Sequence, residues 1–177
     1  MTVTVDPSAF RGALGRFASG VTVVTTTLDG VDHAMTASAF SSVSLDPPLV
    51  LVCSHKNSRF HDAVLTSGIW GVSILAEEGT EASAWFAHRG RPLETQFDHV
   101  PHRRGDSGVV LLEQSLAWLE CRTETVTDGG DHTVIIGAVV GAGVREDLDD
   151  PLLYYRSHYG TIVRLPESEK TVYGGDA

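Results

Sequence analysis

Cysteine, cationic side chains and long apolar runs are all scarce in this sequence. Only 2 of its 177 residues are cysteine, and Cys53 and Cys121 both lie inside apolar runs, where a buried free thiol is the ordinary expectation. The 13 lysines and arginines are outnumbered by 23 aspartates and glutamates, and the net charge of −10 opposes binding to nucleic acid or to an anionic membrane. No apolar run approaches the roughly 18 residues of a membrane span, and no basic segment followed by an apolar stretch opens the chain. We therefore expect a reduced, cytoplasmic protein with no nucleic-acid or membrane partner.

Several nucleotide-binding and catalytic motifs are also missing. The nearest approach to a dinucleotide fingerprint is GAGVRE at residues 141–146, where Glu146 replaces the third glycine and the segment continues a strand instead of opening a helix. There is no P-loop lysine motif and no G-x-S-x-G nucleophile elbow. His99 and His102 have a spacing that a metal could use, but the sequence places no third ligand, and an exposed pair of loop histidines is the simpler interpretation. Any nucleotide must be held in some other way.

The sequence does contain many β-branched segments separated by glycine turns. Strands are expected at residues 21–27, 31–38, 49–54 and 69–75, in a long hairpin of residues 115–127 and 132–144, and as a last strand or pair within residues 152–165. Helices are expected at residues 7–19, at residues 57–68 with Asn57 or Ser58 as the cap, and at residues 78–90. Residues 91–106 read as a long loop and residues 166–177 as a flexible C-terminal tail. This pattern predicts a mainly β protein, a closed or nearly closed antiparallel barrel with short helical inserts.

Serine and threonine crowd residues 36–44, just before a double proline and a buried strand. Thr36, Ser38, Ser41 and Ser42 would lie on a strand edge and its exit loop, where they offer uncharged donors to a phosphate or to the polar edge of a ring. The helix that begins near Asn57 has free amides and a dipole that also favour a phosphate. Together these segments predict the two halves of a phosphate-and-ring cradle. The simpler alternative is that the hydroxyls fill a turn and Ser58 only caps its helix.

Four segments resemble the short-chain flavin reductases that serve two-component flavin-dependent monooxygenases. FASGVTVVTT, MTASAFSSVSLDPPLVLVC, NSRFHDAVLTSGIWGVSIL and GDHTVIIGAV occur in the order and approximate spacing of that family, and the likeness covers roughly residues 8–165. It implies a split β-barrel with a Greek-key core in residues 1–165, a homodimer, and a flavin bound near the subunit interface. It also implies reduction of free FMN or FAD by NADH or NADPH, with release of the reduced flavin to a partner monooxygenase.

The resemblance also implies which residues form the site. The flavin contacts would be Met35, Thr36, Ala37, Ser38, Ser41, Ser42, Cys53, Ser54, Asn57, Ser58, Arg59, Ala87, His88 and Arg89. His132, in the GDH turn, would place the nicotinamide, although an exposed turn histidine is the alternative. No acid, base or metal is needed, because hydride transfer from nicotinamide to flavin is carried by the two nucleotides themselves.

Two departures from the family pattern affect the expected site. Many relatives have serine where this chain has Ala39, which is a mild change. Relatives commonly follow the second helix with an Asp-Arg-Phe-like signature where this chain has LETQFDHV, and this puts the distal part of the flavin or nucleotide site in doubt.

Two further expectations concern assembly and function class. A homodimer is expected because Trp118 would face outward if Leu119 and Cys121 face inward. A non-catalytic flavin carrier, or an enzyme on the same barrel that holds its flavin tightly, stays open as an alternative to the reductase.

Overall fold

Strands make up most of the chain in this computed structural model, which describes residues 5–147 and 150–164. The helices are α1 (Pro7–Leu14), α2 (Arg59–Ser67), α3 (Thr80–Ala87) and the 3-10 turn η1 (Glu77–Gly79). The strands are β1 (Ser19–Gly20), β2 (Thr22–Leu28), β3 (Val31–Ala37), β4 (Phe40–Leu45), β5 (Pro48–His55), β6 (Ile69–Leu75), β7 (His102–Arg104), β8 (Val110–Leu112), β9 (Ser115–Gly129), β10 (His132–Val144), β11 (Leu153–Tyr155) and β12 (His158–Gly160). The expectation of a mainly β protein with few helices is confirmed.

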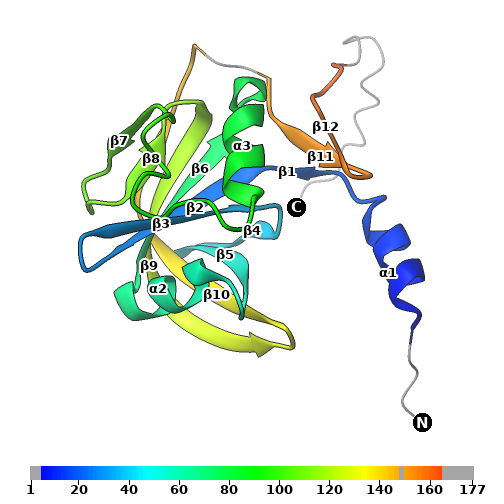
Figure 1. Cartoon of the computed structure of the whole chain (residues 1–177), viewed down its shortest axis with the longest axis horizontal. Coiled ribbons are helices and arrows are strands. Elements are labelled where there is room, and N and C mark those ends of the chain that lie inside the picture. Colours follow the sequence, from blue (N-terminus) through cyan, green and yellow to red (C-terminus); the bar gives the residue numbers. More distant parts are fainter. Residues whose placement is uncertain (1–4, 148–149, 165–177) are drawn as a thin grey trace.

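The main sheet has seven antiparallel strands in the order β3-β2-β6-β9-β10-β5-β4 (Figure 1). Its two edge strands, β3 and β4, are consecutive in the chain and are joined only by Ser38 and Ala39. The Cys53 amide donates to the Ala39 carbonyl over 3.0 Å, so this link is fastened to β5. Among the described strands β3 and β4 do not pair with each other, so hydrogen bonds between these edges do not close the sheet into the expected barrel.

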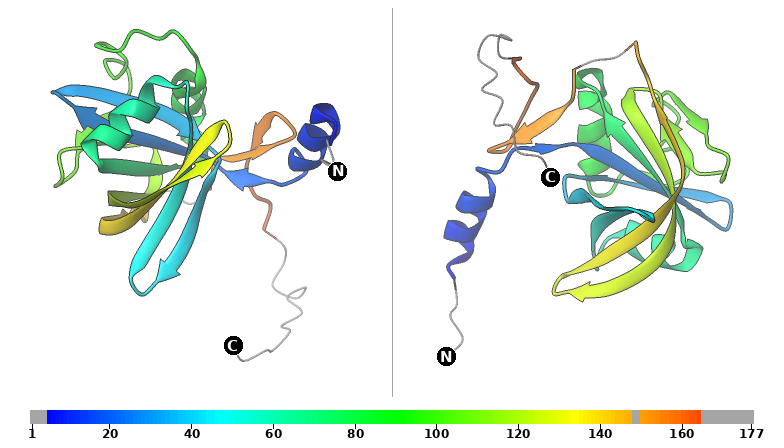
Figure 2. Two further views of the ribbon diagram at one scale, coloured as in Figure 1. Left: turned by 90° about the horizontal axis from the view of Figure 1, so that it is seen from below. Right: turned by 180° about the vertical axis from the view of Figure 1, so that it is seen from behind.

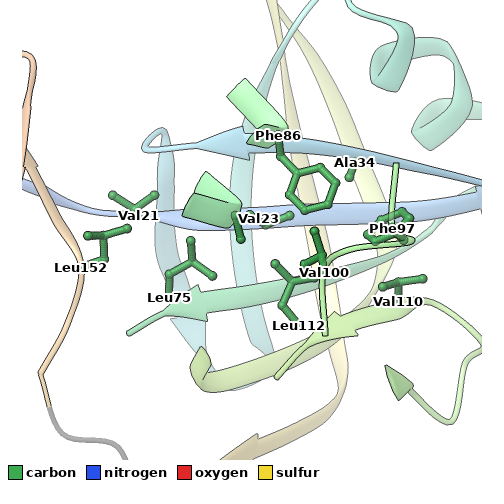
Figure 3. Close-up of a cluster of buried hydrophobic side chains, with 11 residues drawn as sticks. Val21, Val23, Ala34, Leu75, Phe86, Phe97, Val100, Val110, Leu112 and Leu152 are labelled. Atoms are coloured by element: carbon green, nitrogen blue, oxygen red, sulfur yellow. The ribbon is translucent and has the colours of Figure 1, made fainter. Parts of the chain in front are cut away.

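Two clusters of buried side chains fill the two sides of this sheet. One cluster lies between β2, β3 and β6, helix α3 and the segment that follows it, and is drawn in Figure 3; Phe86 and Phe97 are its largest members. The other lies between the sheet and α2, around the fully buried Trp70. A Cβ atom at residue 137 would lie 2.5 Å from the Trp70 ring, which explains the glycine there. The amphipathic α2 lies against this second cluster through Phe60 and Val64.

The first helix differs from its expected form. It ends at Leu14, with Gly15 as its C-cap, whereas the sequence predicted a helix over residues 7–19. No residue of α1 is buried, and it projects from the body beside the β1-β11-β12 sheet (Figure 2). Phe10 and Leu14 are 55% and 57% exposed, and Phe17, which lies beyond the helix end, is 77% exposed. No helix in the described part of the chain is long and apolar enough to cross a membrane.

Two other regions are more ordered than the sequence predicted, and a third agrees with it. The expected loop over residues 91–106 contains β7, which pairs with β8 and forms a flap against β2 and β6. Ser41 and Ser42 lie on a separate strand, β4, not on an exit loop. Residues 152–165 do form a pair, β11 and β12, whereas the predicted tail at residues 166–177 lies outside the described residues.

Trp118 does not provide the expected reason for a dimer. Its side chain is only partly exposed, because the Arg103 guanidinium stacks over its ring at 4.6 Å. A Cβ atom at residue 143 would lie 2.4 Å from the same ring, so Gly143 lets this tryptophan lie against β10. The tryptophan is therefore covered within its own chain.

The flap is anchored by a buried carboxylate. Glu120 is only 2% exposed and accepts hydrogen bonds from the amides of Asp106, at 3.1 Å, and Ser107, at 2.6 Å, and from the Ser107 hydroxyl. Burial by itself raises the pKa of Glu120, but the Ser107 and Asp106 donors outweigh it and leave the pKa below its ordinary value of 4.5. The ionised form therefore stabilises the fold above about pH 4.5, and this contribution is lost as the pH falls through the lowered pKa.

We expect Glu120→Gln to reduce the free energy of unfolding at pH 7 by about 1–3 kcal/mol, because one amide of the flap then faces an NH2 group in place of an acceptor. The difference between wild type and variant should shrink as the pH falls below 4.5. Urea unfolding at a series of pH values measures both effects. An equal loss of stability at pH 7 and pH 3.5 would show that the negative charge is not its source.

Candidate functional site

A cleft of about 410 Å³ lies where β3, the start of α2 and the end of α3 meet. In Figure 1, α3 and α2 lie above and below the edge strand β3. The cleft is lined by residues 34–36, residues 57–60 and residues 86–91. These segments lie far apart in the sequence, and they contain Met35, Thr36, Asn57, Ser58, Arg59, Ala87, His88 and Arg89 of the predicted site. The structure thus brings these eight residues together.

The start of α2 presents free amides to the cleft. Ser58 is the N-cap, as one of the two sequence alternatives had it, and its hydroxyl accepts from the His61 amide over 3.2 Å. The first amides of a helix have no partner within the helix, so those of Arg59 and Phe60 are available at this end. Such a terminus, with its positive dipole end, favours an anion.

Two of the predicted hydroxyls are used within the protein. The Thr36 hydroxyl donates to the Ser83 carbonyl over 2.7 Å and so ties β3 to α3. Ser54 is fully buried, and its hydroxyl lies 3.3 Å from that of Ser58 and 3.8 Å from the Met35 sulfur. Ser54 therefore supports the cleft from behind and does not line it.

One of the arginines that line the cleft, Arg91, was not predicted from the sequence. Arg91 is 8% exposed, and the Arg59 guanidinium donates to the Arg91 carbonyl over 2.9 Å. Burial, followed by the charge of Arg59, lowers the pKa of Arg91 to about 10, so it stays protonated at neutral pH. With Arg89, three arginines line the cleft and no carboxylate does. In the sequence, Arg91 stands between a glycine and a proline in an expected loop, and no local pattern there indicates that its side chain is buried.

Other predicted residues lie in a second hollow of about 490 Å³, whose lining includes the β3–β4 link, Ser38 and Ala39. Ser38, Ser41 and Cys53 line it, together with the aromatic rings of Phe17, Phe40 and Tyr154. Burial raises the pKa of the Cys53 thiol, which keeps it neutral. Its mixture of rings and hydroxyls suits a flat, partly polar molecule.

Ala37 and Ser42 line neither depression. Ala37 is buried in the second hydrophobic cluster, at the end of β3, and Ser42 is exposed on β4. Of the predicted flavin residues, these two and the buried Ser54 are thus the ones that the structure does not bring to a cavity surface.

His132 also lies outside both depressions, but next to the first. It pairs in register with His55, and the two rings lie 5.0 Å apart, edge to face. The Lys56 amide donates to the Asp131 carbonyl over 3.0 Å, which fastens the β9–β10 turn to the loop before α2. The imidazole pairs with Asp131 at 2.7 Å, and this hydrogen bond lowers the pKa of the Asp131 carboxyl. The turn histidine therefore lies against the end of β5 and the loop that leads into α2.

The two histidines whose spacing a metal could use lie near the flap. His99 and His102 both line a further hollow, and His102 makes a ring contact with Phe97. Within residues 5–147 and 150–164, no three His, Cys, Asp or Glu side chains gather closely enough to hold a metal ion.

Comparison with known proteins gives one consistent result. Residues 14–163 match the flavin reductase-like domain. The reductase subunit HsaB of a flavin-dependent monooxygenase from Mycobacterium tuberculosis is 39% identical over 172 residues, which cover 97% of this chain and 88% of that protein. A flavin reductase (NADH) from Kitasatospora aureofaciens is 40% identical over 158 residues, 88% of this chain and 81% of that one. The crystal structure of BorF, the flavin reductase component of a bacterial two-component tryptophan halogenase, has a TM-score of 0.84 at 39% identity and covers 90% of this chain and 100% of that chain.

Proposed function

The chain belongs to the flavin reductase-like domain family, and from this premise we propose that it is an NADH-dependent flavin reductase that supplies reduced FMN or FAD to a partner monooxygenase. The observation that carries the proposal is the cleft itself. In a chain of net charge −10, its lining holds three arginines, a helix N-terminus and no carboxylate. Such a lining fits the phosphates of a flavin nucleotide. The adjoining hollow, with its hydroxyls and aromatic rings, fits the flavin ring.

The roles of individual residues follow from this arrangement. Arg59 and the amides at the start of α2 would hold phosphate oxygens, and Ser58 would keep that helix end in place. Ser38 and Ser41 would face the polar edge of the ring. His132 would orient the nicotinamide from the β9–β10 turn. When bound, NADH gives a hydride to the flavin ring, which also takes a proton from solvent, so the products are NAD+ and reduced flavin.

Fold and assembly are part of the same proposal. We assign the curled sheet to a split barrel with a Greek-key core, because the edges β3 and β4 are linked through Ser38 and Ala39 without pairing.

We also assign a homodimer, because α1 has no buried residue and exposed apolar side chains continue onto Tyr154 of β11. A cytoplasmic location would give the enzyme access to NADH.

The test of function is NADH oxidation, followed at the nicotinamide absorbance band, with and without added FMN or FAD. We expect many turnovers only when flavin is added, because the flavin is a substrate that leaves after reduction. Extensive dialysis provides the control. A protein that keeps stoichiometric flavin through dialysis, and oxidises NADH without further addition, would be an enzyme with a resident flavin, and one that binds flavin without oxidising NADH would be a carrier.

Substitution of His132 and Ser58 tests the division of the site. His132→Ala should lower kcat/KM for NADH by roughly 5- to 150-fold, the effect of one lost polar contact, with flavin affinity nearly unchanged. Ser58→Ala removes the α2 cap and should weaken flavin binding more than NADH use. Steady-state kinetics with each substrate varied in turn measures both. If the two variants damage flavin binding equally, the nicotinamide role of His132 is wrong.

Sedimentation velocity tests the homodimer. The wild-type protein should sediment as a dimer at micromolar concentration, and Phe17→Ser should weaken the dimer because it removes a ring that is 77% exposed in the single chain. Val126→Ser, a change of another exposed apolar side chain on β9, is the matched control and should leave the dimer intact. A monomeric wild-type protein would refute this assignment without affecting the proposed reaction.

A further inference from the structure

Arg91 makes an unusual set of contacts for a buried charge. Its Nε donates to the Gln96 side-chain oxygen over 3.0 Å, and its Nη1 donates to the carbonyls of Phe86 and His88, both over 2.9 Å. Its Nη2 donates to the carbonyl of Ala34. All four acceptors are neutral oxygens, and Arg91 makes no ion pair with the described part of the chain.

These contacts hold two walls of the cleft together. Phe86 and His88 belong to the end of α3 and the loop that follows, whereas Ala34 belongs to the edge strand β3. In a strand, the N–H and C=O groups of residues i and i+2 point to the same side. The Thr36 amide therefore points to the same side of β3 as the Ala34 carbonyl. That side is turned away from β2 and toward the cleft. One guanidinium therefore fixes the position of the post-α3 loop relative to the free edge of β3.

Arg91 also controls the orientation of Arg59. The Arg91 carbonyl accepts from Nη2 of Arg59 over 2.9 Å, and the other N–H groups of that guanidinium make no hydrogen bond with the described residues. Those groups are free to meet an anion in the cleft. A shift of the loop that carries Arg91 would turn Arg59 away from its present direction.

Within the described residues, neither Arg59 nor Arg91 makes an ion pair. A buried guanidinium is costly without a countercharge, and the charge of Arg59 disfavours the charged form of Arg91. Neutral carbonyls offset part of this cost through hydrogen bonds, but they supply no negative charge. An anionic ligand would supply it.

We propose that Arg91 is a positioning residue that holds Arg59 and the post-α3 loop in their phosphate-facing arrangement, and that it thereby makes the enzyme select FMN and FAD over riboflavin. This inference rests on the proposed function, because it names the class of flavin that the same cleft accepts. Arg91 is not catalytic, since its donors are occupied by the protein and it acts through Arg59 and the loop.

The experiment compares FMN and riboflavin as acceptors at saturating NADH. In the wild-type protein, kcat/KM should be at least about 10-fold higher for FMN. Arg91→Met should raise KM for FMN by roughly 10- to 100-fold with kcat changed less than about 3-fold, and should change KM for riboflavin by less than about 3-fold. Arg91→Lys keeps the charge, but an ammonium group cannot donate to all four acceptors of the guanidinium. This variant should therefore retain more of the FMN preference than Arg91→Met, but less than the wild-type protein.

Arg104→Lys is the matched control. Arg104 also clamps the strand β3, through Asp32, but it does so from β7 and does not line the cleft. This variant should lower the thermal midpoint and leave the FMN-to-riboflavin ratio unchanged. If Arg91→Met lowers kcat/KM for both flavins equally, or changes their ratio no more than Arg104→Lys does, the inference is overturned. Should Arg91→Met fail to fold, the same criterion applied to Arg91→Lys decides.

Direct binding separates this inference from the proposed function. Quenching of flavin fluorescence gives Kd for FMN and riboflavin without NADH. A wild-type protein that prefers FMN in this titration but never oxidises NADH would refute the reductase and leave the role of Arg91 intact. A protein that reduces FMN and riboflavin with equal kcat/KM would support the reductase and refute the role of Arg91 in selecting FMN.

Discussion

The link of two residues between β3 and β4 is the constraint on which the rest of the structure depends. In a flat seven-stranded sheet the two edge strands would lie about 29 Å apart, at six spacings of about 4.8 Å. The chain from Ala37 to Phe40 spans at most about 11 Å. The sheet must therefore curl until its edges approach each other. The curl brings β3 close to the end of β5, where the Ser54 hydroxyl lies 3.8 Å from the Met35 sulfur. The cleft is lined by residues of β3 before the link, and the hollow by the link and the start of β4.

The distribution of charge explains how an acidic protein can attract an anionic nucleotide. The net charge of −10 acts over long distances, where salt screens it beyond about 8 Å. Arg59 and Arg91 act at contact distance in the cleft, and Arg91 is buried, where screening is weaker. Carboxylates are absent from the cleft lining, and Asp32, on the same strand, is instead paired with Arg104. The local field therefore decides what binds, and the net charge limits nonspecific contacts with nucleic acid or anionic lipid.

The parts of the fold that the sequence predicted correctly are those decided by neighbouring residues. The α2 cap at Ser58 and its end at Gly68, and the hairpin at residues 115–144, depend on local signals that act within a few residues. The end of α1 at Leu14, the strand β4 and the flap strand β7 were not predicted. Both strands pair with the next strand along the chain, β5 and β8, but their short polar segments, FSSVSL and HRR, lack the run of β-branched residues that marks a strand in the sequence. For the site, the sequence predicted most of the segments that line the cleft. It did not predict the burial of Arg91, which depends on the carbonyls of Ala34 and Phe86, 57 and 5 residues away.

The hydroxyl-rich stretch serves the structure and the site together. Thr36 uses its hydroxyl to hold α3, and the Ser41 hydroxyl donates to the backbone of its own strand, so both hydroxyls already have a partner within the protein. On the outer edge of β3, Arg91 and Gln96 already donate to the carbonyls of Ala34 and Asp32, so the part of this edge left for a ligand is the segment near Thr36. Backbone amides and hydroxyls bind a ring without fixed charge. If the flavin lies as proposed, the charged contacts are confined to its phosphate side, and the ring side would hold an oxidised and a reduced flavin with similar strength. A protein that hands its product to another enzyme needs both forms to leave readily.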